Sequence, residues 1–301
     1  MKCKTLEVTI DLSELLEKEA TGTLKNDDFS RVWTNVVMMP IYRIEYIIRE
    51  SNHTKAGYNL DEAFYYGLLN RIRAFLCYER RIVCAKLLNL ELCSVINRII
   101  LEDNISLRYF IIHHEKLDDY RKSCFRGEIE FEDQILKNRE ERKHDDPIIY
   151  KWEEGLLDSI KRAYSTVGLT SEQIRTIRIK QPPKVQDMAK EVDLDILYTS
   201  YRLECHSTHG DWFDISRYFL QEKDGLFFPR FEEDKIDIRK INPMLLPTCE
   251  TILFFLQKIK GHGLDESVNS EIYKDIQLIQ DFDRMHFNYI KKLPLLYNIV
   301  K

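Results

Sequence analysis

The chain has 301 residues and a formal net charge of -5, with 44% hydrophobic and 32% charged residues. This balance excludes wholesale disorder, and the negative charge argues against a surface coated everywhere with nucleic acid. Ten glycines and eight prolines are too few for a collagen, an elastic linker or a turn-rich β-sandwich. The composition therefore favours helix.

Helical periodicity dominates the chain after a short alternating segment at residues 5–10 that resembles a strand. A peripheral helical pattern begins at residue 13, and a longer one at 29–48 contains Pro40, which we expect to kink or split it. The pattern then restarts after Asn59, whose side chain can cap free backbone N–H groups. Further helices are predicted at 60–88, 90–114, 137–143, 148–164, 184–208, 245–259 and 266–289.

The predicted elements define an all-α fold, a single helical bundle at residues 59–301 with a small amino-terminal extension at 1–58. Helices 60–88 and 90–114 are expected to be antiparallel neighbours, with 184–208 packed against them. The longest apolar runs fall short of the roughly 20 residues that a membrane-spanning helix needs. The amino terminus also lacks an apolar signal region, so we expect no membrane association.

Cysteines and known motifs indicate a cytoplasmic protein without metal or cofactor. The seven cysteines are scattered and form no C-x-x-C pair, which is typical of reduced thiols. The sequence contains neither a Gly-rich phosphate loop nor an H-E-x-x-H or G-x-S-x-G motif. His206 and His209 are three apart, but no carboxylate or second cluster stands at a matched spacing, so no metal site is expected.

Two segments carry the candidate chemistry. Arg98 and Glu102 are four residues apart on one helical face, and we expect a largely buried pair that is structural or lines a cleft. Arg202 and His209 are seven apart, so two helical turns bring them to the same face. Arginine binds phosphate oxygens with a planar fork and histidine titrates near neutrality, which together suit a phosphodiester site. The alternative is a helix end where His209 and Trp212 pack and cap.

The motifs Asn97-Arg98-Ile99-Ile100-Leu101-Glu102 and Tyr201-Arg202…Ser207-Thr208-His209-Gly210-Asp211-Trp212 resemble those of an uncharacterised all-α bacterial family. Its members carry an R-x-x-x-E helix and a later Y-R…S…H-G-x-W helix. That family is similar to the HEPN group of helical proteins, whose active members are metal-independent ribonucleases with an R-x(4–6)-H motif. They usually act as symmetric dimers in toxin–antitoxin and phage-defence systems. The resemblance covers roughly residues 60 to 260 in element order.

The resemblance implies two catalytic residues, Arg202 and His209, and a set of supporting residues: Tyr198, His206, Asp211, Arg98 and Glu102. Arg108 and His113 also fit the motif and form an alternative catalytic pair. Five residues turn a regular helix by about 500°, so these two side chains diverge by about 140°. In active members a polar residue tends to follow the arginine, whereas Leu203 and Tyr109 stand at these positions here.

Two functions stay open. One is an endoribonuclease of a bacterial defence or toxin-type system, which cleaves RNA by attack of the 2′-OH on phosphorus. Between residues 161 and 184 six basic residues accompany one acidic residue, so Arg175, Arg178, Lys180 and Lys184 are expected to bind RNA unless this is an ordinary solvated connection. The other function is a non-catalytic helical module that binds a protein or a nucleotide. A homodimer and a defence-system partner protein are expected from the family likeness.

Overall fold

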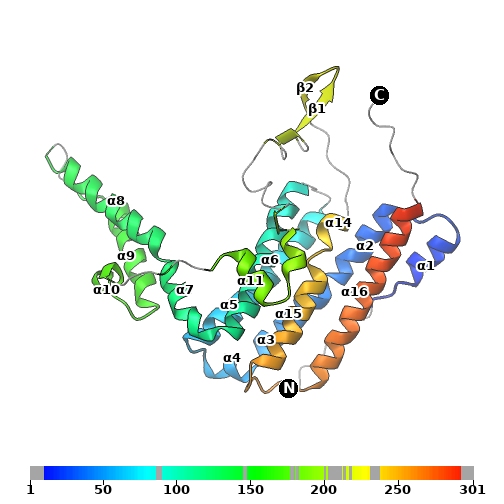
Figure 1. The fold of residues 1–301 in the computed structure, drawn as a ribbon, viewed down its shortest axis with the longest axis horizontal. Helices are drawn as coiled ribbons and strands as arrows, with labels where there is room; N and C mark the ends of the chain where they lie inside the picture. The colour runs from blue at the N-terminus through cyan, green and yellow to red at the C-terminus, as the bar shows by residue number, and fades with distance from the viewer. Residues whose placement is uncertain are drawn as a thin grey trace. The chain divides into compact units, whose positions relative to one another are not determined.

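A computed structural model describes residues 10–85, 90–144, 148–176, 180, 183–199, 201–202, 212, 215–216, 219–230 and 238–292. These residues are mostly α-helical and include one two-stranded hairpin, so the prediction of an all-α fold is confirmed (Figure 1). The short strand expected at 5–10 falls almost wholly outside the described residues. None of the helices described is long and apolar enough to cross a bilayer.

The chain forms two compact units. Unit 1 comprises residues 1–111 and 185–301, and unit 2 comprises residues 112–184. The structure thus divides the chain at points other than the expected boundary after residue 58. Phe29, Trp33 and Val36 of the expected amino-terminal extension are fully buried in unit 1. Their burial makes this segment part of the core.

Unit 1 is a helical bundle, with helical turns also at 195–199 and 201–202. Its helices are α1 (Ser13–Ala20), α2 (Asn26–Val36), α3 (Met38–Glu50), α4 (Asn52–Ala56), α5 (Leu60–Cys84), α6 (Leu90–Ile112), α11 (Val185–Glu191), α14 (Ile238–Ile241), α15 (Leu245–Lys258) and α16 (Ser267–Lys292). Helix α3 packs against α5, α15 and α16, and α15 lies along α16 (Figure 1). The core of unit 1 is therefore built from segments at both ends of the sequence.

Local sequence explains where several of these helices begin. The helix expected at 29–48 is two helices, and Pro40 stands in the first turn of α3, where its missing N–H has no intrahelical partner to lose. Asn59 caps α5 as expected, since its side chain accepts hydrogen bonds from the backbone N–H groups of Asp61 at 3.0 Å and Glu62 at 2.9 Å. The helix expected at 184–208 is interrupted, because α11 ends at Glu191 and Asp193 has a φ of 56°.

A buried ion-pair network fixes α3 to α16. Arg43 donates from Nε to Asp275 at 2.6 Å and also pairs with Glu271. Burial works to lower the pKa of Arg43, but the hydrogen bond and charge of Asp275 outweigh it, so this pKa is raised. Removing one partner of such a network leaves a buried charge without a counter-charge, which lowers the free energy of unfolding. The network therefore stabilises the packing of α3 against α16.

Unit 2 contains the 3₁₀ turn η1 (His114–Lys116) and the helices α7 (Leu117–Ser123), α8 (Arg126–Arg142), α9 (Lys151–Ser165) and α10 (Ser171–Thr176). A small apolar cluster centres on Ile160, Tyr164 and Ile174. Glu153 of α9 is buried and accepts hydrogen bonds from Arg139 at 3.1 Å and Arg142 at 2.8 Å. The charged residues of this unit therefore form ion pairs within it as well as a surface exposed to solvent.

An antiparallel hairpin joins β1 (Leu220–Lys223) to β2 (Leu226–Pro229), and the sequence analysis did not predict it. Its turn consists of Asp224 and Gly225, with φ values of 54° and 77°. Two consecutive positive φ values are the requirement of a type I′ turn, which Asp-Gly satisfies well. Phe227 of β2 contacts Trp212 edge-on, with ring centroids 5.2 Å apart.

Candidate functional site

Helix α6 presents Arg98 and Glu102 on one face, as its 3.6-residue periodicity requires. Both residues are partly buried, neither fully buried nor fully exposed. The Arg98 guanidinium lies over the ring of Tyr201 at 5.3 Å from its centroid, and Nη2 is 3.4 Å from the Tyr201 hydroxyl. The expected contact between this face and segment 198–212 is therefore present. Partial exposure spares both charges the full cost of desolvation.

The ring of Tyr201 also stacks on Tyr198, with centroids 5.5 Å apart and an interplanar angle of 21°. A spacing of three residues places two helical side chains on the same side, which explains this stack. We call Arg98, Tyr201 and Tyr198 the Arg98 stack. A cation over an aromatic ring contributes about 0.5–1 kcal/mol at a partly exposed site, and it holds the turn at 201–202 against α6.

Arg202 follows the Arg98 stack directly and its side chain is exposed to solvent. Its expected partner His209 lies outside the described residues, as do His206 and Asp211. The pairing of Arg202 with His209 thus stays a prediction. The structure describes Arg202 as an exposed residue next in the chain to Tyr201, whose ring stacks on Tyr198.

The alternative pair, Arg108 and His113, has a different character. Arg108 is 9% exposed and donates from Nε to the Thr251 hydroxyl at 2.8 Å. It also contacts the Pro247 carbonyl at 3.4 Å and the Glu250 carboxylate at 3.6 Å. Burial lowers the pKa of Arg108, against the opposing charge of Glu250. Arg108 therefore links α6 to α15, while His113 follows the end of α6.

The basic segment expected to bind RNA carries its own counter-charges. Arg175 pairs with Glu132 at 2.8 Å and with Asp133 at 2.5 Å, and Lys180 pairs with Asp119 at 2.5 Å. Lys184 is exposed, and Arg178 lies outside the described residues. Within unit 2 these carboxylates therefore pair with two of the six basic residues between 161 and 184.

A buried carboxylate on α6 was missed by the sequence analysis. The Asp103 side chain is 4% exposed, and its Oδ1 accepts a hydrogen bond from Arg71 of α5 at 2.8 Å. Burial raises the pKa of Asp103 to about 7, although the Arg71 charge acts in the opposite direction. The available signal was the polar run Glu102-Asp103-Asn104, which is too long for one helical face and so places a polar side chain toward the apolar side of α6.

Metal coordination has no candidate in the part of the chain that the structure describes, where no three His, Cys, Asp or Glu side chains are grouped suitably.

In comparisons with known proteins, the model of a family of unknown function, DUF5677, matches residues 73–226, just over half of the chain. The match includes Arg98, Glu102 and the Tyr198–Arg202 turn. No curated protein and no solved structure matches the chain.

Proposed function

The chain belongs to the DUF5677 family of unknown function, and we propose that it is a HEPN-like, metal-independent endoribonuclease. The observation that carries this proposal is the Arg98 stack, whose Tyr201 immediately precedes the exposed Arg202 in the chain. An exposed guanidinium binds phosphate oxygens, and tyrosine rings offer surfaces on which unpaired RNA bases stack.

The reaction proposed is attack of a ribose 2′-OH on the adjacent phosphorus. A bond forms between the 2′ oxygen and phosphorus while the bond from phosphorus to the 5′ oxygen breaks, which leaves a 2′,3′-cyclic phosphate and a 5′-hydroxyl. His209 accepts the 2′-OH proton or returns a proton to the 5′ oxygen. Arg202 neutralises the charge that develops on the non-bridging oxygens, which is the role a metal ion would otherwise take.

The cellular setting in this proposal derives from the HEPN resemblance. It comprises a cytoplasmic homodimer in a bacterial defence or toxin-type system, with a partner protein that controls it. A second copy also provides cover for apolar helix faces, as is usual for symmetric homo-oligomers.

The test is cleavage of labelled single-stranded RNA by the purified full-length protein in EDTA, beside a matched substrate with a single 2′-deoxyribose at the cleavage site. The wild type should cut the first and spare the second. His209→Ala should reduce the rate by about a hundredfold, as for the loss of a general acid–base group, and Arg202→Gln should reduce both binding and rate. His113→Ala is the matched control and should retain activity. Full activity of His209→Ala, or no cleavage by the wild type, would refute the proposal.

A non-catalytic protein-binding module is the second candidate, favoured by the surface of unit 2. Ile148, Ile149 and Trp152 are 61%, 56% and 59% exposed at the start of α9. Clustered exposed apolar residues mark interaction surfaces, and the ion-paired Arg175 and Lys180 are less available to RNA. Wild-type protein that neither binds nor cuts RNA, together with a protein partner lost on Trp152→Glu, would support this module.

A further inference from the structure

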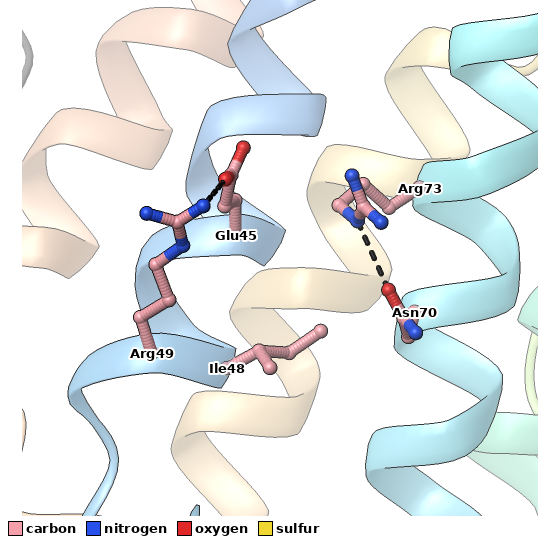
Figure 2. A pocket seen from close by; sticks show the side chains of 5 residues that line it. All are labelled: Glu45, Ile48, Arg49, Asn70 and Arg73. Carbon is pink, nitrogen blue, oxygen red and sulfur yellow. Dashed lines mark hydrogen bonds and ion pairs between the residues drawn. The ribbon is translucent and has the colours of Figure 1, made fainter.

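A hollow of about 180 Å³ lies between α3 and α5, and its lining shares no residue with the Arg98 stack (Figure 2). It is lined by Glu45, Ile48, Arg49, Asn70 and Arg73. Since one water occupies roughly 30 Å³ in the liquid, the hollow has room for a compact molecule of several heavy atoms. All five residues belong to unit 1.

The side that α5 contributes is rich in hydrogen-bond donors. Arg73 donates from Nε to the Asn70 side-chain oxygen at 3.0 Å, which orients both groups (Figure 2). Among the described residues, no partner takes the two terminal nitrogens of Arg73 or the amide nitrogen of Asn70. A planar guanidinium with two free nitrogens matches the oxygens of a phosphate group.

The side that α3 contributes holds an ion pair between Glu45 and Arg49, four residues apart, with Ile48 between the two polar pairs (Figure 2). Two arginines and one glutamate leave an excess of one positive charge around the hollow. Glu45 is the one group in this lining that repels an anion. Arg43, a further cation on α3, is already committed to Asp275 and Glu271.

We propose that this hollow binds a small anion that carries a phosphate group, held by Arg73 and Asn70, with the Glu45-paired Arg49 on the opposite side adding positive charge. The same phosphate chemistry is offered by free orthophosphate and by the terminal phosphate of a nucleotide. The lining favours either over a neutral ligand, because Arg73 already stands oriented with unused donors. This site is independent of the proposed ribonuclease, which uses other residues.

The test is isothermal titration calorimetry of the full-length protein with inorganic phosphate, and in parallel with adenosine monophosphate, at constant ionic strength against a chloride control. We expect wild-type binding with a dissociation constant of about a millimolar or below. Arg73→Gln should weaken it at least about tenfold. Glu45→Gln should tighten it several-fold, because a repelling charge near the anion is removed. Arg81→Gln, which removes an exposed arginine from the same helix, should leave binding unchanged.

Opposite responses to Arg73→Gln and Glu45→Gln distinguish a defined site from general attraction to positive charge. Equal affinities for the two ligands would mean that the phosphate group alone accounts for binding. Tighter binding of adenosine monophosphate would mean that the site also contacts the rest of the nucleotide. Both outcomes support the site. Absence of binding to either ligand, unchanged binding in an Arg73→Gln variant with a wild-type circular dichroism spectrum, or an equal loss in Arg81→Gln would overturn the proposal. These binding measurements do not depend on whether the protein cleaves RNA.

Discussion

Replacing Asp103 with asparagine should stabilise the protein above neutral pH. The carboxyl group is 4% exposed on α6, and its Oδ2 is buried without a hydrogen-bond partner among the described residues. Arg71 reaches Oδ1 at 2.8 Å, but its own side chain is 51% exposed and water screens its charge. Burial therefore dominates and raises the pKa of Asp103 from 3.8 to about 7.

Proton linkage gives the sign and the size of the effect of Asp103 on the free energy of unfolding. Between pH 3.8 and about 7 the folded state retains a proton on Asp103 that the unfolded state releases, so the free energy of unfolding falls as pH rises through this window. A pKa difference of this size corresponds to a loss of about 4 kcal/mol at alkaline pH, since each pKa unit is worth about 1.4 kcal/mol. Asparagine resembles the protonated carboxyl in shape and cannot ionise, so it should recover about 2–4 kcal/mol near pH 8.

Urea denaturation followed by circular dichroism measures this effect at about pH 5 and about pH 8. The difference between Asp103→Asn and wild type should be about 3 kcal/mol larger at the higher pH than at the lower one, because about two pH units of the linkage window lie between them. Asp281→Asn, at a 42% exposed carboxylate on α16, is the control and should change little at either pH. A stability difference between Asp103→Asn and wild type that is the same at both pH values would mean that Asp103 ionises as freely in the folded state as in the unfolded chain.

Two further substitutions test the packing of unit 1. Arg43→Ala should destabilise the protein by about 3–5 kcal/mol, because it strands the buried carboxylate of Asp275, and a loss below about 1 kcal/mol in a urea titration would contradict this role. Asn59→Ala should cost about 1 kcal/mol, because two backbone N–H groups at the start of α5 lose their acceptor, and Asn59→Asp should retain most of the stability in the same titration.

The sequence predicted those parts of the fold that depend on local pattern. The start of α5 was visible because Asn59 and Glu62 form a capping box at fixed spacing. Helices α15 and α16 were visible because long runs carry apolar residues every three or four positions. The β-hairpin was missed although Asp224-Gly225 is a strong turn signal, because its strands have only four residues each and a helical composition argued against them.

Burial at the candidate site depends on residues far along the chain, which spacing cannot reveal. Arg98 and Arg108 lie in the same helix, yet Arg98 meets Tyr201 near the surface and Arg108 is buried against Thr251. The contacts that decide their environments span 103 and 143 residues. Similarly, the basic character of segment 161–184 was evident, but the pairing of Arg175 with Glu132 and of Lys180 with Asp119 was not, because these partners are 43 and 61 residues apart in the sequence.

In the sequence, unit 2 is inserted between the two segments that make up unit 1, and this order has a consequence for synthesis on the ribosome. Unit 2 is one continuous segment whose contacts are local, so it can fold soon after residue 184 leaves the exit tunnel. Unit 1 has to wait, because α3 receives its buried partners Glu271 and Asp275 from the last helix to be made. Until then α5 can already cover part of α2 and α3, but the surface of α3 that packs on α15 and α16 stays exposed in the nascent chain, where exposed apolar surface favours aggregation.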